Sequence, residues 1–321
     1  MLQLHGDWNI FPASINYYGP GKMNKDTHDG IFYAAAAFIL WGLLPVYWKS
    51  LEEVPALELL CNRIVWSLFF VAILLSCKKR WAEVKSALAD KKGKILLTIS
   101  SCLIGTNWFV YIWAVNHNHV VDTSMGYYMT PLMNALLGFI FMKERLNRLQ
   151  VIAITLAACG VVYSIIDFGH IPYIALTLAV SFAFYGLVRK VMKVESLPGL
   201  FVETAVLAPL SAIYLLWLAF SGEISIYKIS LMDNILLLGA GAATSLPLIF
   251  FAHGARRLRL VTLGMMQYIA PTLALMLGVF VYEEPFNSAR LVTFAFIWSG
   301  IAVYVADGLN KNFKTISSSK N

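Results

Sequence analysis

Hydrophobic residues fall into ten runs along this chain, each about 20 residues long and separated from the next by a short polar segment. A bilayer core of about 30 Å needs about 20 apolar helical residues to cross it. Only helices and closed barrels satisfy their backbone polar groups in lipid, and these runs lack the alternation of barrel strands. The pattern predicts ten membrane-spanning helices, at residues 30–49, 57–76, 95–115, 123–142, 149–166, 172–188, 199–220, 234–253, 260–282 and 289–306.

The second half of the chain repeats part of the first. Residues 129–147 have the sequence MTPLMNALLGFIFMKERLN, and residues 269–287 have IAPTLALMLGVFVYEEPFN. At a fixed offset of 140, positions 120–147 and 260–287 share eight identities in 28, among them Tyr128/Tyr268, Pro131/Pro271, Gly138/Gly278, Glu144/Glu284 and Asn147/Asn287. Leu and Val matches between apolar helices carry little weight. Tyr, Pro, Gly, Glu and Asn in the same order indicate an internal duplication.

The duplication predicts two repeats of five helices, residues 30–166 and 172–306, with tails at 1–29 and 307–321. Because five is odd, the second repeat begins on the opposite side of the membrane and is inverted. Inverted repeats are a common transporter architecture that places a site near the midplane. The expected fold class is therefore an all-α integral membrane protein of ten transmembrane helices in two inverted five-helix repeats.

The N-terminal tail, residues 1–29, fits no helix in the sequence pattern. It also lacks the charged start, apolar core and cleavage site of a signal peptide. Two explanations stay open. Either translation begins at Met23, so that residues 1–22 are absent from the native protein, or the segment is a short ordered tail.

Composition supports a membrane protein. The chain has 321 residues, of which 59% are hydrophobic and 13% charged, and its mean hydropathy is +0.68. Soluble domains are about 45–50% apolar and about 25% charged, so a soluble globule could not bury this much apolar surface. The four cysteines lie in or beside apolar runs without metal-ligand spacing. We therefore expect free thiols, no disulfide framework and no metal site.

The net charge of +7 is spread over short loops between the runs. This distribution argues against a nucleic-acid-binding face. If the N-terminus is cytoplasmic, the cytoplasmic segments hold 21 Lys and Arg residues and the outer segments three, and Arg63 is left within a run. The excess of positive charge on the cytoplasmic side predicts that both termini are cytoplasmic.

The span 30–306 resembles the drug/metabolite transporter superfamily, and within it the RarD-type permeases of the EamA family. The resemblance lies in LEEVPALELLCNRIVWS, IGTNWFVYIWAVN, SFAFYGLVRK, RLRLVTLGMMQYIAPTL and VTFAFIW, which together touch both halves. It implies a carrier of small molecules in the bacterial inner membrane, with a central cavity between the halves. It leaves the substrate open. The longer N-terminal tail is the main departure from the family.

Charged residues within apolar runs are costly in a membrane and are candidates for function. Arg63 lies seven residues into the second run. It could bind an anionic substrate group, or it could be a structural arginine that bonds neighbouring helix ends or extends toward the interface. Glu203 could bind a coupling proton, or it could stabilise a helix N-terminus, as could Glu58 in the comparable position of the first half.

Polar residues recur on the faces of three further runs. Asn107 and Tyr111 share one face of the third run at positions i and i+4. The fourth run carries Tyr127, Pro131, Asn134 and Gly138, and the ninth repeats this spacing as Gln267, Pro271, Ala274 and Gly278. Because proline frees a backbone carbonyl, both helices are expected to be kinked. The amides could line a cavity or form hydrogen bonds between helices. We favour the cavity, and we add the repeated pair Tyr128 and Tyr268 to its lining.

Aromatic residues in the middle of runs can bound a pocket. Trp41 and Tyr185 occupy matching places in the first and sixth runs, each followed by Gly and Leu. Other Trp and Tyr residues, such as Trp48, are expected to belong to interfacial belts. His117 and His119 do not share a helix face, so we expect an outer loop and no metal site there.

The leading hypothesis is secondary transport of a small metabolite or drug, by export or exchange. The chain has no GxxxxGK phosphate-binding loop, so no ATPase activity, ATPase partner or cofactor is implied. The alternative is an intramembrane enzyme or a lipid-handling protein. That chemistry would need an HExxH pair, a nucleophilic Ser in a Gly-rich setting or paired aspartates, and none occurs. We expect an amino-acid-like or amphiphilic substrate. The sequence does not identify that substrate, and it does not define the oligomeric state.

Overall fold

All regular structure in the described part of the chain is helical. The computed structural model describes residues 25–117, 119–169, 171–283 and 288–318. The helices are α1 (Lys25–Lys49), α2 (Ala56–Cys77), α3 (Trp81–Ala89), α4 (Lys91–Asn116), α5 (Val120–Ile140), α6 (Arg148–Phe168), α7 (Tyr173–Val191), α8 (Ser196–Ser221), α9 (Leu231–Arg257), α10 (Leu260–Gln267), α11 (Ile269–Phe280) and α12 (Ser288–Ser318). A short 3-10 helix, η1 (Ser225–Tyr227), lies between α8 and α9.

Within these described residues, nine helical segments are long and apolar enough to cross a membrane. They are α1, α2, α4, α6, α7, α8, α9, the continuous segment Leu260–Phe280 and α12. The tenth predicted run also forms a helix, α5, but it is not among the nine. Amide, hydroxyl and proline residues interrupt its apolar run. A multi-pass helical membrane protein is thus confirmed, and a crossing by α5 stays a prediction.

Several boundaries differ from those expected. The first 29 residues were expected to form no helix, but α1 begins at Lys25; residues 1–24 lie outside the described residues. At the other end, α12 continues to Ser318, through most of the expected tail 307–321. The run 260–282 is divided at Tyr268 into α10 and α11. The positively charged loop after α2 contains the additional helix α3.

Local sequence explains the bounds of α6. The Asn147 side chain accepts a hydrogen bond from the Gln150 backbone N–H, and the Gln150 side chain accepts one from the Asn147 N–H. This capping box satisfies two backbone groups that a helix start leaves free. The helix ends at Gly169, whose φ of +81° lies in the left-handed region that glycine adopts without strain.

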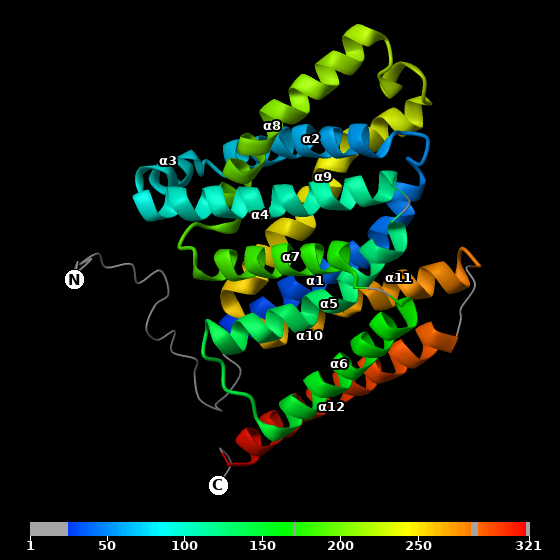
Figure 1. Ribbon diagram of the computed structural model, residues 1–321. Helices are drawn as coiled ribbons and strands as arrows, with labels where there is room; N and C mark the ends of the chain where they lie inside the picture. The colour runs from blue at the N-terminus through cyan, green and yellow to red at the C-terminus, as the bar shows by residue number, and fades with distance from the viewer. Residues whose placement is uncertain (1–24, 118, 170, 284–287, 319–321) are drawn as a thin grey trace, which may run out of the picture.

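The helices divide into a central bundle and a peripheral pair. In Figure 1, α6 and α12 lie side by side below the other helices, and α6 also contacts α5. Within the bundle, α1 packs on α9, α2 packs on both α8 and α9, and α7 packs on both α4 and α5. The split segment α10–α11 lies against α5 and α1. Helices from the two halves of the chain are therefore interleaved.

Two glycines make the α6–α12 contact close. A Cβ atom on Gly300 of α12 would lie 2.5 Å from the carbonyl oxygen of Ala153. A Cβ atom on Gly160 of α6 would lie 2.7 Å from the carbonyl oxygen of Thr293. The contacts are reciprocal, since both Gly300 and Thr293 lie 140 residues after their counterparts Gly160 and Ala153. Without a hydrophobic driving force between helices in lipid, such close backbone packing contributes much of the association.

Replacing Gly300 by Leu should force α6 and α12 apart, because the new side chain has no space against the Ala153 carbonyl. We expect a loss of about 1–3 kcal/mol, as for other overpacked sites. Gly308→Leu is the matched control, since a Cβ atom at Gly308 on the same helix meets nothing within 4 Å. Thermal unfolding of the purified protein in detergent measures both. Equal melting temperatures for the two variants would contradict the close contact.

Candidate functional site

Arg63 of α2 lies among aromatic side chains from other helices. Its Nε donates a hydrogen bond to Oγ1 of Thr244 in α9, at 3.0 Å. Its guanidinium carbon lies 4.5 Å from the ring centre of Trp48 in α1 and 5.9 Å from that of Trp108 in α4. A guanidinium over indole rings is attracted by their π faces. Four helices therefore meet around one cation.

The side chains around Arg63 are only partly buried. Tyr111 of α4 and Tyr127 of α5 interact electrostatically with the guanidinium, and their hydroxyls interact with each other. Tyr127 is 51% exposed. We define the Arg63 site as Trp48, Arg63, Trp108, Tyr111 and Tyr127, all of which are at least partly exposed.

Two of the predicted site residues, Arg63 and Tyr111, meet at the Arg63 site. Trp48 was expected in an interfacial belt, because it lies near a helix end, and sequence alone gives no signal that it stacks on Arg63. Thr244 was also missed: a lone threonine in an apolar run has no distinctive pattern. Both contacts depend on how α1 and α9 pack against α2.

Trp41 and Tyr185, the matching aromatics, lie in one aromatic cluster. Trp41 contacts Phe182 and Phe251 at ring-centre distances of 5.6 and 5.5 Å. The Tyr185 ring is stacked with that of Phe251 at 6.0 Å. Tyr185 is buried and Trp41 is partly buried. The cluster joins α1, α7 and α9 in the core of the bundle.

Glu203 of α8 is at the centre of a buried polar cluster. Its carboxylate accepts hydrogen bonds from the Ser100 hydroxyl, the Tyr185 hydroxyl (3.2 Å) and Nη1 of Arg189 (3.3 Å). Glu203 and Arg189 are each 1% exposed. Arg189 had been counted with the cytoplasmic loop charges. The carboxylate therefore connects α8 to α4 and α7, and it forms no cap on its own helix.

Glu58, the comparable residue in the first half, has different partners. Its carboxylate accepts hydrogen bonds from the Ser225 backbone N–H (2.9 Å) and hydroxyl (2.7 Å), and it is buried. It therefore stabilises the start of η1 and not the start of α2, where the sequence placed its capping role. Glu58 and Glu203 are thus both buried carboxylates that join their own helix to a distant segment.

The predicted amides form hydrogen bonds between helices. Nδ2 of Asn134 donates to Oε1 of Gln267 at 2.8 Å, which joins α5 to α10. Asn134 is fully buried, and its Oδ1 has no hydrogen-bond partner in the described residues. Nδ2 of Asn107 donates to the Leu178 carbonyl and to the Ser181 hydroxyl of α7. In this conformation these amides therefore lie in helix interfaces.

The repeated tyrosines contact each other across the same interface. The hydroxyl of Tyr268 donates to the carbonyl of Tyr128 at 3.2 Å, and Tyr268 is fully buried. Tyr268 is also the residue at which α10 ends and α11 begins, three residues before Pro271. Because Pro271 lacks an N–H group, the helix loses a hydrogen bond at this point. Pro131, its counterpart, lies within α5, which is continuous.

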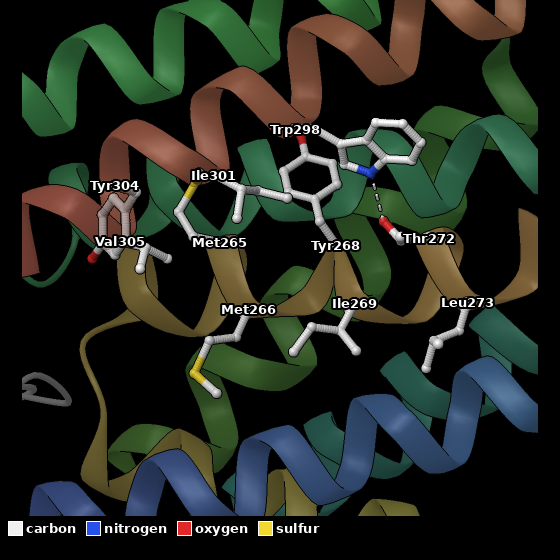
Figure 2. A pocket seen from close by; sticks show the side chains of 10 residues that line it. All are labelled: Met265, Met266, Tyr268, Ile269, Thr272, Leu273, Trp298, Ile301, Tyr304 and Val305. Carbon is white, nitrogen blue, oxygen red and sulfur yellow. Dashed lines mark hydrogen bonds between the residues drawn. The ribbon is translucent and has the colours of Figure 1, made fainter. Parts of the chain in front are cut away.

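A groove of about 350 Å³ lies between α10–α11 and α12. Figure 2 shows that its lining residues, Met265, Met266, Tyr268, Ile269, Thr272, Leu273, Trp298, Ile301, Tyr304 and Val305, are almost all apolar. Nε1 of Trp298 donates to the Thr272 hydroxyl at 3.1 Å, which satisfies both groups. The groove carries no charged group, and of the predicted site residues it includes only Tyr268.

Glu144 explains why the repeated segment ends in a glutamate. Its position at a helix end predicts a structural role, and in the fold it is 2% exposed. Its carboxylate accepts hydrogen bonds from the backbone N–H groups of Leu260 (2.7 Å) and Val261 (3.1 Å), the first residues of α10. A helix start leaves such groups free and is favourable for an anion. Gly138 leaves room for this carboxylate, because a Cβ atom there would lie 2.9 Å from Oε2 of Glu144. Glu284 and Asn287, the later copies, lie outside the described residues.

The loop between α7 and α8 is attached to the end of α9. Oε1 of Glu195 lies 2.8 Å from Nη1 of Arg256. Burial raises the pKa of the Glu195 carboxyl, but the adjacent Arg256 guanidinium outweighs it, so the pKa lies below its ordinary value. The stabilisation is therefore present at neutral pH and is lost as the pH falls through the lowered pKa.

His117 and His119, near the end of α4 and the start of α5, contact neighbouring side chains. Nδ1 of His119 lies 3.2 Å from Oδ2 of Asp122, and the His117 ring is stacked on Trp113. The described ranges hold no group of three or more His, Cys, Asp or Glu side chains suited to a metal ion.

Known proteins resemble both the sequence and the fold. Residues 28–166 match the EamA-like transporter family. Protein RarD of Salmonella typhi is 47% identical over 285 residues, which cover 89% of this chain and 97% of that protein. Protein RarD of Escherichia coli (strain K12) is 44% identical over 291 residues, 91% of this chain and 98% of that one. The uncharacterized transporter YojE of Bacillus subtilis (strain 168) is 47% identical over 88% of this chain and 95% of its own.

A solved crystal structure matches with a TM-score of 0.66 at 20% identity, and the match covers 86% of this chain and 96% of the other. At that identity the likeness concerns the fold alone.

Glu144→Ala should destabilise the protein, because the first N–H groups of α10 would remain buried without an acceptor. The expected loss is about 1–3 kcal/mol. Glu144→Gln should lose less, since its amide oxygen still accepts a hydrogen bond. Glu52→Ala, at an exposed loop position, is the control. Thermal unfolding in detergent measures all three. A melting temperature for Glu144→Ala equal to that of the control would show that this carboxylate is not needed at the helix start.

Proposed function

This chain belongs to the EamA family, among its RarD-type permeases, and on that premise we propose that it is a secondary transporter that exports or exchanges a small metabolite or drug. The cargo is amino-acid-like or amphiphilic, and chloramphenicol belongs in any test panel. The observation that carries the proposal is the Arg63 site, where a partly exposed cation lies among aromatic side chains and Thr244 on helices of both halves. A pump driven by ATP would need a nucleotide site, for which the chain has no motif.

The helix contacts support two inverted repeats. If α1, α2, α4, α5 and α6 correspond to α7, α8, α9, α10–α11 and α12, the contacts that these helices make between the halves have counterparts, whereas the contact of α3 with α8 has none among the described residues. The contact of α1 with α9 corresponds to that of α7 with α4, and the contact of α2 with α9 corresponds to that of α8 with α4. The pairs α2–α8, α5–α10 and α6–α12 correspond to themselves. With α5 as the tenth crossing, each repeat has five helices and the second is inverted.

Alternating access follows from such a repeat. Two similar halves can exchange their conformations, and the site between them then opens to the other side. The Tyr268–Tyr128 and Asn134–Gln267 bonds join the corresponding helices α5 and α10, so these contacts are the ones that rocking would remake. The break at Tyr268 gives the second half an additional point of bending.

Glu203 is the candidate for proton coupling. Three donors hold its carboxylate in the ion-paired state, so protonation would require the Arg189 contact to open. A conformational change that separates Glu203 from Arg189 would therefore link proton binding to the state of the carrier. Uncoupled exchange is the competing proposal, because few other carboxylates lie within the helices.

The charge distribution supports cytoplasmic termini in a multi-pass protein of the bacterial inner membrane. The alternative function, an intramembrane enzyme or a lipid-handling protein, fits less well, because residues 28–166 match a transporter family and the relative YojE is described as a transporter. The apolar groove of Figure 2 is the feature that a lipid-handling protein would use.

Counterflow in proteoliposomes tests the proposal. Vesicles with the purified protein are preloaded with one unlabelled compound from a panel of amino acids, nucleosides and chloramphenicol, and entry of the labelled compound is followed. Transient accumulation of a labelled compound above its outside concentration is expected for one of them. If correctly folded protein gives no accumulation with any panel member, the proposed range of cargo is wrong.

The double variant Asn134→Leu/Gln267→Leu should abolish counterflow with little loss of folded protein. Removing both partners of a buried hydrogen bond is milder than removing one, so the fold should persist while the contact between α5 and α10 changes. Size-exclusion chromatography reports folding, and Thr177→Leu, at an exposed position on α7, controls for an added leucine. Full counterflow by the double variant would remove these two amides from the transport path.

Glu203→Gln should remove any response of counterflow to an imposed proton gradient, because the amide cannot take up a proton in this pH range. Exchange at zero gradient should persist if the fold is retained. Glu58→Gln is the matched control, since this buried carboxylate contacts η1 and no cation in the described residues. An unchanged gradient response in Glu203→Gln would place the coupling elsewhere or favour plain exchange.

A further inference from the structure

We propose that the Arg63 site binds the carboxylate group of an organic acid, with the aromatic or apolar part of that acid against Trp48 and Trp108. The proposal rests on the proposed transport function and names the chemical class of its cargo. It is based on the contacts that the Arg63 guanidinium makes with Thr244, Trp48 and Trp108, and on its lack of a carboxylate partner in the described part of the chain.

Arg63 has no acidic partner among the described residues. None of the ion pairs between described side chains includes it, and its electrostatic neighbours are the neutral phenols Tyr111 and Tyr127. Elsewhere in the same bundle a buried arginine, Arg189, is paired with Glu203 at 3.3 Å. A cation within a membrane domain is costly unless an anion neutralises it. The missing anion at Arg63 can come from a bound ligand.

The hydrogen-bonding geometry leaves part of the guanidinium free for that ligand. Its Nε is bonded to Thr244, which orients the group. The two terminal nitrogens, Nη1 and Nη2, make no hydrogen bond with described residues. A buried nitrogen without a partner would be an unsatisfied buried donor, and neither nitrogen is one. They are therefore accessible. Two parallel N–H donors in one plane match the two oxygens of a carboxylate, which is the pairing that arginine makes most specifically.

The surroundings favour an acid with an aromatic or apolar body. The indole rings of Trp48 and Trp108 lie against the guanidinium and are themselves partly exposed, so they present flat apolar surface beside the cation. The hydroxyls of Tyr111 and Tyr127 add donors on the side of α4 and α5. A cationic cargo would be repelled by Arg63, and a neutral one would leave its charge without a partner.

A matched pair of probes tests the charge. Indole-3-acetate and its neutral amide, indole-3-acetamide, differ at the carboxylate and share the ring. Each is titrated into the purified full-length protein in detergent, and the shift in unfolding temperature gives an apparent affinity. This readout does not depend on transport. Inorganic phosphate and benzoate are titrated in parallel.

We expect the acid to stabilise the protein and the amide to bind at least about tenfold more weakly, as loss of a charge-assisted bidentate contact implies. Arg63→Gln should weaken binding of the acid by about the same factor, and Arg63→Lys should weaken it less. Each variant is compared with its own ligand-free baseline, so a change in intrinsic stability does not enter. Lys228→Gln, which removes one exposed positive charge from a loop, should bind like the original protein.

Several outcomes would overturn the proposal: equal binding of acid and amide, acid binding that Arg63→Gln leaves unchanged, a response to phosphate as strong as to the organic acids, or no response to either acid. Counterflow separates this failure from failure of the proposed function. Counterflow of a neutral cargo that persists in Arg63→Gln would retain the transporter and reject the acid site. Arg63-dependent acid binding without any counterflow would retain the site and reject the transporter.

Discussion

In the hydrocarbon core of a membrane every polar group has to find its partner within the protein, and this constraint determines most of the described structure. Glu144 shows it most directly, because its buried carboxylate satisfies the first backbone N–H groups of α10. At the end of α9 the Lys190 ammonium donates to the carbonyls of Ala255 and Leu258. The end of α9 is thus completed by a side chain from α7, and the start of α10 by one from the loop between α5 and α6. Polar contacts of this kind fix which helix ends lie together.

The same constraint explains why small residues are placed where helices cross. Lipid tails are as apolar as Leu side chains, so helices gain little from apolar contact alone and depend on close backbone approach and internal hydrogen bonds. Gly264 of α10 allows the Pro131 carbonyl of α5 to approach, since a Cβ atom there would lie 2.6 Å from that oxygen. The Asn134–Gln267 bond forms at the same crossing. Close packing and polar pairing therefore reinforce each other where the two halves meet.

Much of this architecture could be predicted because it depends on the local pattern of apolar and polar residues. The length of each apolar run and the internal offset of 140 residues depend on neighbouring residues only, and nearly all the predicted runs match helices. Tertiary partners were harder to predict. Arg189 lies at the end of its run and was counted as a loop charge, whereas in the fold it turns inward to Glu203. A structural role for Glu144 follows from its position at a helix end, but its partners, the first N–H groups of α10, could not be predicted. Whether a polar residue at a helix end is buried or exposed depends on which helix packs beside it. The local sequence does not show which helix that is.

Arg63 and Glu203 illustrate how the same constraint separates structural from functional charges. Both lie in apolar helices, and sequence treated them alike as candidates. The Glu203 carboxylate accepts hydrogen bonds from three donors, so in this conformation its charge stabilises the contact between α4, α7 and α8. Arg63 is held in place by a neutral hydroxyl and two indole rings, none of which cancels its charge. A membrane protein that keeps such a cation accessible gains nothing in stability from it. The charge is explained if its counterion arrives with the cargo and leaves with it.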